Sequence, residues 1–119
     1  MKVKTSELTG PALRWAVAQI EKVRLTGAGF QYLRKTYGDE CVRLGHGGAY
    51  SPDTNWSQGG PIIERRRVLF HGEGDGNAYN AWIVEPYSRA GGPTHLVAAM
   101  RCCAASELGD EVDVPEELL

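Results

Sequence analysis

The segment of residues 50–64, YSPDTNWSQGGPIIE, concentrates side chains that can recognise a flat polar ligand. The rings of Tyr50 and Trp56 can stack on a planar group, and the amides of Asn55 and Gln58 can donate to and accept from its edges. Prolines and two adjacent glycines interrupt the segment, and it is too polar for a buried strand, so we expect an ordered loop. This loop is the predicted ligand-binding site.

Three consecutive arginines follow the loop, in a stretch that we expect to be a strand. Because strand side chains alternate, Arg65 and Arg67 would share one side while Arg66 takes the other. Aromatic faces combined with a guanidinium group suit a nucleotide or single-stranded nucleic acid. In the alternative, Trp56 and Trp82 are core aromatics and the arginines form a solvated edge. The predicted ligand-binding residues are Tyr50, Asp53, Asn55, Trp56, Ser57, Gln58, Glu64, Arg66, Trp82 and Trp15.

Catalytic chemistry has weaker support in the sequence. The histidines His46, His71 and His95 are far apart and lack the spacing of a zinc motif. Asp53 and Glu64 could form a carboxylate pair, but a turn cap and an ion pair are the usual roles of such residues. We therefore predict no catalytic residue, no metal and no cofactor. A binding protein is favoured over an enzyme, and a nucleotide-acting hydrolase is the third hypothesis.

Size and composition indicate one globular domain over residues 1–119. The net charge of −2 and the pI of about 5.9 argue against a duplex-DNA-binding protein, which would usually be basic. No stretch is apolar enough to predict a signal peptide or a membrane span, so we expect a cytosolic protein. Cys41, Cys102 and Cys103 are odd in number and two are adjacent, so we expect reduced thiols.

The expected elements alternate between short strands and two longer helices. Apolar residues at helical spacing predict helices over residues 11–24 and 93–108. The expected shorter elements are a strand around Val3, a helix or turn over 30–37, strands over 41–44, 62–70, 79–87 and 111–114, and loops over 71–77 and 89–92. These elements predict an α+β fold in which two helices pack on a small, mainly antiparallel sheet.

The two helices carry different surfaces. The second is small and apolar on several sides, so we expect it to pack between the sheet and the first helix. In the first helix, Trp15 falls opposite the apolar stripe of Leu13, Val17 and Ile20. A neighbouring loop could cover Trp15, it could lie in a homo-oligomer interface, or it could be half exposed.

Long irregular strings of the sequence resemble the NinX-like family of small tailed-phage (lambdoid) proteins. The resemblance is carried by residues 3–18, 50–65, 92–101 and 109–118. It implies a phage or prophage accessory protein made in the host bacterial cytoplasm, from a genome region that also carries recombination and regulatory functions. It implies no reaction, because the function of the family is undefined.

Two positions depart from the family pattern. Arg14 stands where the family leads us to expect an acidic residue, and His95 stands where it leads us to expect proline. On the sequence alone, neither position is therefore given a functional role.

Two classes of function follow from these observations. In the first, the protein is a non-enzymatic binder of a small ligand, sequestering a nucleotide signal of host anti-phage defence, with a pocket that could lie at a homodimer seam. In the alternative, it is an accessory module for recombination that binds a protein or single-stranded DNA. The absence of recognisable catalytic machinery beside the aromatic and arginine residues favours the first.

Overall fold

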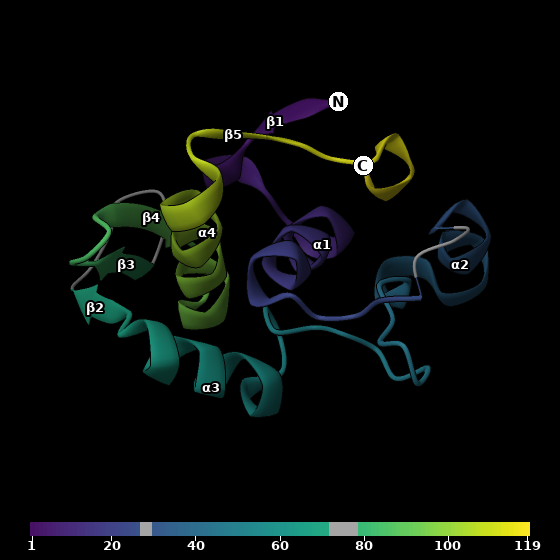
Figure 1. Cartoon of the computed structure of the whole chain (residues 1–119), viewed down its shortest axis with the longest axis horizontal. Coiled ribbons are helices and arrows are strands. Elements are labelled where there is room, and N and C mark those ends of the chain that lie inside the picture. Colours follow the sequence, from purple (N-terminus) through teal and green to yellow (C-terminus); the bar gives the residue numbers. More distant parts are fainter. Residues whose placement is uncertain (27–29, 72–78) are drawn as a thin grey trace.

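The computed structural model describes residues 1–26, 30–71 and 79–119. Within them lie four α-helices, five short strands and three turns of 3₁₀-helix (Figure 1). The elements are β1 (Lys2–Lys4), α1 (Gly10–Glu21), α2 (Phe30–Tyr37), α3 (Trp56–Arg66), β2 (Leu69–His71), β3 (Tyr79–Ile83), β4 (Ser88–Gly92), α4 (His95–Leu108) and β5 (Glu111–Asp113), with 3₁₀ turns at Thr5–Glu7, Gly38–Glu40 and Glu116–Leu118.

Helix α4 is the central element of the fold. It packs on β3 and β4 on one side and on α1 on another, as Figure 1 shows. Small side chains let the neighbouring backbones approach closely, and burial of the helix supplies much of the core. Its predicted position between the sheet and the first helix is confirmed. The buried residues of α4 are Leu96, Val97, Ala98, Ala99, Met100, Cys102, Cys103 and Ala104.

The strands form two small antiparallel sheets. One has the order β2-β3-β4, with Phe70 opposite Ala81 and Ala81 opposite Ala90, and the other pairs β1 with β5. The predicted hairpin of β2 and β3 and the last edge strand are confirmed. The hairpin tip, expected over residues 71–77, lies outside the described residues apart from His71.

Strand β4 corrects the prediction of a loop over residues 89–92. Its inward side chains are small, which lets α4 approach the strand closely. A Cβ atom built on Gly92 would lie 2.8 Å from the backbone nitrogen of Ala98. The glycines that suggested a loop are therefore explained in part by helix-on-strand packing.

Helix α3 is the largest correction to the predicted fold. We predicted a loop over residues 50–64 and a strand over residues 62–70, yet Trp56–Arg66 is helical. Asn55 caps the helix, because its side-chain oxygen accepts a 2.9 Å hydrogen bond from the backbone nitrogen of Ser57. Burial of Ile62 against the core outweighs the low helix propensity of the two glycines and of Pro61.

The remaining predictions are confirmed in part. Helix α1 ends at Glu21 rather than near residue 24, because Lys22 adopts a left-handed conformation. A helix is present at Phe30–Tyr37. Residues 41–44 form only isolated bridges and no strand.

The α+β class is correct, but the described chain has four helices and two sheets rather than two helices on one sheet. None of its described helices has the length and apolar character to cross a membrane.

Gly59 is required by the packing of α3, whereas its neighbour Gly60 is not. A Cβ atom on Gly59 would lie 2.3 Å from the Pro52 carbonyl oxygen and 2.6 Å from Leu96 Cδ2, while one on Gly60 meets nothing within 4 Å. We expect Gly59→Ala to lower the free energy of unfolding by about 1–3 kcal/mol. Gly60→Ala should be neutral or stabilising by up to about 1 kcal/mol. Urea unfolding of both variants would measure this, and equal effects would contradict it.

The three cysteines give a second test of the core. All are buried, and burial raises the pKa of Cys41 and Cys102 and raises that of Cys103 to about 12. Because the thiolate is the reactive form, the native protein should react with Ellman's reagent only at the rate of unfolding, even at mildly alkaline pH. Rapid labelling of the folded protein would show that the core is more open than described.

Candidate functional site

A buried ion pair anchors the segment that precedes α3. Nε of Arg14 on α1 lies 2.7 Å from Oδ1 of Asp53, and the two residues are only 7% and 4% exposed. A second nitrogen of Arg14 donates to the backbone carbonyl of Asp39. Arg14 thus connects α1 to the segments around Asp39 and Asp53, which lie 25 and 39 positions farther along the sequence. No role was predicted for Arg14, because this residue departs from the family pattern and its partner Asp53 lies 39 positions away.

Other polar residues of the predicted loop hold its backbone in place. Nε2 of Gln58 donates to the carbonyl of Ala49 at 2.9 Å, and its Oε1 accepts from the backbone nitrogen of Ser51 at 2.6 Å. Tyr50 is buried, its hydroxyl has no hydrogen-bond partner among the described residues, and burial raises its pKa. Gln58 and Asn55 therefore fix the segment, and Tyr50 is a core residue.

Trp56 opens onto a cleft of about 350 Å³. Its side chain is 57% exposed at the first turn of α3. Residues from β2, β3 and α4 contribute further rings. The ring centroids of Tyr79 and His95 lie 4.0 Å apart, and the ring of Phe70 meets that of His95 edge-on, with 5.0 Å between centroids. We call this site the aromatic cleft; its lining residues are Asp53, Thr54, Trp56, Tyr79, Pro93, Thr94, His95 and Leu96.

The electrostatics of the aromatic cleft come from backbone and from a neutralised carboxylate. Helices α3 and α4 both begin at its wall, with Asn55 and Thr94 as their N-caps. Helix N-termini carry partial positive charge and favour a nearby anion. The carboxylate of Asp53 is paired with Arg14, which reduces its repulsion of an anion. The cleft can therefore take a flat ring with an attached negative group.

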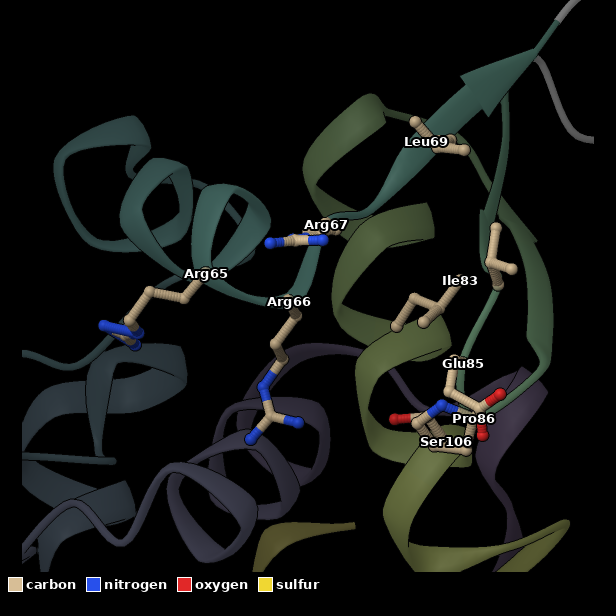
Figure 2. A pocket seen from close by; sticks show the side chains of 9 residues that line it. Arg65, Arg66, Arg67, Leu69, Ile83, Glu85, Pro86 and Ser106 are labelled. Carbon is tan, nitrogen blue, oxygen red and sulfur yellow. The ribbon is translucent and has the colours of Figure 1, made fainter.

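A second cleft, of about 650 Å³, contains the three arginines. We call it the arginine cleft; its lining residues are Arg65, Arg66, Arg67, Leu69, Ile83, Val84, Glu85, Pro86 and Ser106. Figure 2 shows the side chain of Arg65 extending away from Glu85, Pro86 and Ser106, whereas that of Arg66 runs in a different direction, toward α1. The three arginines therefore line one cleft, but their charged groups do not converge on one point.

Internal ion pairs explain the direction of these arginines. Both Arg65 and Arg66 bind the carboxylate of Glu21, and Arg66 also donates to Glu107 at 3.0 Å and to the Ile20 carbonyl at 3.2 Å. Burial acts to lower the pKa of Arg66, but its hydrogen bonds to Glu21 and Glu107 outweigh this and raise it. Arg66 joins α3 to α1 and α4, so its charge is already matched within the protein.

The structure brings together only part of the predicted ligand-binding set. Asp53 and Trp56 share the aromatic cleft, whereas Arg66 lines the arginine cleft. Trp82 lies half-buried on the outer side of β3, and Trp15 packs half-buried against the core. Ser57 and Glu64 are exposed on α3, outside the linings of both clefts.

Tyr79, Thr94 and His95 line the aromatic cleft but were not predicted as site residues. The sequence predicts that the second helix starts at Pro93, whereas Thr94 is the N-cap of α4, a role that marks a helix start and not a ligand. Metal binding gains no candidate site, because no cluster of three His, Cys, Asp or Glu side chains occurs within residues 1–26, 30–71 and 79–119.

A family model described as "Bacteriophage P22, NinX" matches residues 4–107 of the chain. The matched region contains Arg14 and Asp53 and all residues that line the two clefts. It ends before β5. No curated protein matches the chain.

The Arg14–Asp53 pair should be essential for stability. Asp53→Asn or Arg14→Met alone leaves a buried charge without its partner, so we expect a loss of about 3–5 kcal/mol in the free energy of unfolding. The double variant Arg14→Met/Asp53→Asn should lose less than the sum of the single losses. Chemical denaturation of the three variants tests this coupling, and additive effects would contradict it.

Proposed function

The chain belongs to the bacteriophage P22 NinX family, a family of undefined function, and we propose that it is a non-enzymatic binder of a nucleotide-like ligand. The site is the aromatic cleft. The observation that carries this proposal is the shared lining of exposed Trp56 and the closely packed, tilted rings of Tyr79 and His95. Exposed aromatic rings in one cleft suit the stacking of a base.

The size and polarity of the cleft support a mononucleotide. A volume of about 350 Å³ lies at the lower end of typical small-molecule pockets, which favours one base with its sugar over a dinucleotide. The hydroxyl of Thr54 and the start of α4 lie on the same cleft and can meet the sugar or phosphate. The base would then lie near Trp56.

The groups available in the cleft favour binding over catalysis. The carboxylate of Asp53 is already paired with Arg14, so it is poorly placed to act as a base. His95 packs against Tyr79 and Phe70. The two residues have no hydrogen bond to one another or to a neighbouring nucleophile within the described chain, as general-base catalysis would require.

A phage protein that retains a nucleotide without converting it would lower the free concentration of that nucleotide in the infected cell. Sequestration of a nucleotide signal of host defence is therefore the biological role that we propose. This role requires a dissociation constant below the working concentration of the signal. A homo-oligomer, with Trp15 at the contact, stays a prediction.

Mass spectrometry of the material released on heating tests the proposal. We would incubate the purified protein with mono-, di- and cyclic nucleotides, remove the excess, heat the protein and identify what it releases. We expect an intact nucleotide, with affinity reduced about tenfold or more in Trp56→Ala through loss of stacking. Tyr87→Ala, which removes another exposed aromatic outside the cleft, is the matched control.

Each other outcome would change the assignment. A converted product would identify an enzyme and overturn the binding role. Nucleotide retention that is equal in wild-type protein, Trp56→Ala and Tyr87→Ala would place the ligand elsewhere. No retention by the folded wild-type protein would contradict nucleotide binding altogether.

A further inference from the structure

The sheet β2-β3-β4 has one covered face and one open face. Ala81 and Ile83 are buried on the side of β3 that faces α4. Asn80 and Trp82, which alternate with them, therefore point the other way. In Figure 1 the three strands lie at one side of the molecule, with α4 on their inner side. Leu69 on the outer face is 44% exposed. The outward residues of the strands are Leu69, His71, Asn80, Trp82, Arg89 and Gly91.

Cross-strand pairing arranges these residues in two rows. Trp82 in the central strand lies opposite Leu69 on one side and Arg89 on the other. His71 belongs to the next row, yet its ring meets Trp82 edge-on at 6.4 Å, and its Nε2 lies 3.1 Å from a guanidinium nitrogen of Arg89. The indole therefore lies in a group formed by Leu69, His71 and Arg89.

The open face has a charge opposite to that of the chain as a whole. The protein carries 15 Asp and Glu residues and a net charge of −2, yet none of the six outward positions is a carboxylate. Arg89 lies at one end of the row through Trp82. At the other end Leu69 lines the arginine cleft together with Arg67, and the same cleft also holds Glu85. A cation thus stands toward each end of an apolar and aromatic row.

We propose that this outer face binds single-stranded nucleic acid. The indole of Trp82 stacks on an unpaired base, and the amide of Asn80 can meet a base edge. Arg89 and Arg67 contact the phosphates on either side. An open sheet face with aromatic and basic side chains is well suited to such a strand. This surface is separate from the aromatic cleft, and the inference does not rest on the proposed nucleotide binding.

Single strands fit this face better than duplex. A duplex is bound mainly through neutralisation of many phosphates, and the face offers few cations in a protein of net negative charge. Stacking needs unpaired bases, which a duplex does not present.

Fluorescence anisotropy with labelled oligothymidylate, oligouridylate and a duplex of equal length tests this inference. We expect both single strands to bind, more weakly as salt increases, and the duplex to bind at least tenfold more weakly. The DNA and RNA arms show which polymer is preferred. Binding of the duplex as tightly as the single strands would overturn the proposal, as would flat titrations of folded protein at low salt.

Variants locate the binding on the proposed face. Trp82→Leu retains an apolar side chain beside Leu69 but removes the stacking surface, so affinity should fall about tenfold. Arg89→Gln should lower affinity and reduce the slope of log affinity against log salt by about one. Tyr32→Ala and Lys35→Ala, both on exposed positions of α2, are the aromatic and cationic controls.

The variants also separate this inference from a protein-docking role. Unchanged oligonucleotide binding in folded Trp82→Leu and Arg89→Gln would overturn the assignment of the face. Loss of a phage or host protein partner in these variants, together with no oligonucleotide binding by the wild-type protein, would assign the face to a protein instead.

Discussion

The buried pair of Arg14 and Asp53 is the constraint on which the arrangement of both clefts depends. It fixes the turn before α3 to α1, and the carbonyl of Asp39 is held by the same guanidinium. Because α3 starts directly after that turn, the pair sets where Trp56 emerges and where the arginines at the other end of α3 arrive. A second set of ion pairs, from Arg66 to Glu21 and Glu107, fixes the far end of the helix to α1 and α4.

This geometry separates residues that lie close together in the sequence. Trp56 and Arg66 are the first and last residues of α3, and a rise of 1.5 Å per residue puts them roughly 15 Å apart along its axis. A strand or loop over this segment could have brought the indole of Trp56 and the guanidinium of Arg66 to one small ligand. In the helix, Trp56 and Arg66 line different clefts.

The sequence predicted the elements whose patterns are local. Helix α4 has a continuous apolar stripe and was predicted close to its observed position. The strand predicted over residues 79–87 was too long, because β3 ends at Ile83 and a turn leads to β4. Helix α3 was not predicted, because Gly59, Gly60 and Pro61 lower its intrinsic propensity, whereas the burial of Ile62 that stabilises it depends on the fold. Trp56 was predicted as a site residue, but Tyr79 and His95 join it only through the fold.

The three tryptophans offer the most direct test of which surface takes a nucleotide. Trp56 lines the aromatic cleft and Trp82 lies on the outer face of the sheet, whereas Trp15, a residue of α1, packs against the core. In an NMR titration of ¹⁵N-labelled protein with mononucleotides, we predict that the indole N–H signal of Trp56 shifts while that of Trp15 does not. No shift at Trp56, or a shift at Trp82 alone, would contradict nucleotide binding in the aromatic cleft.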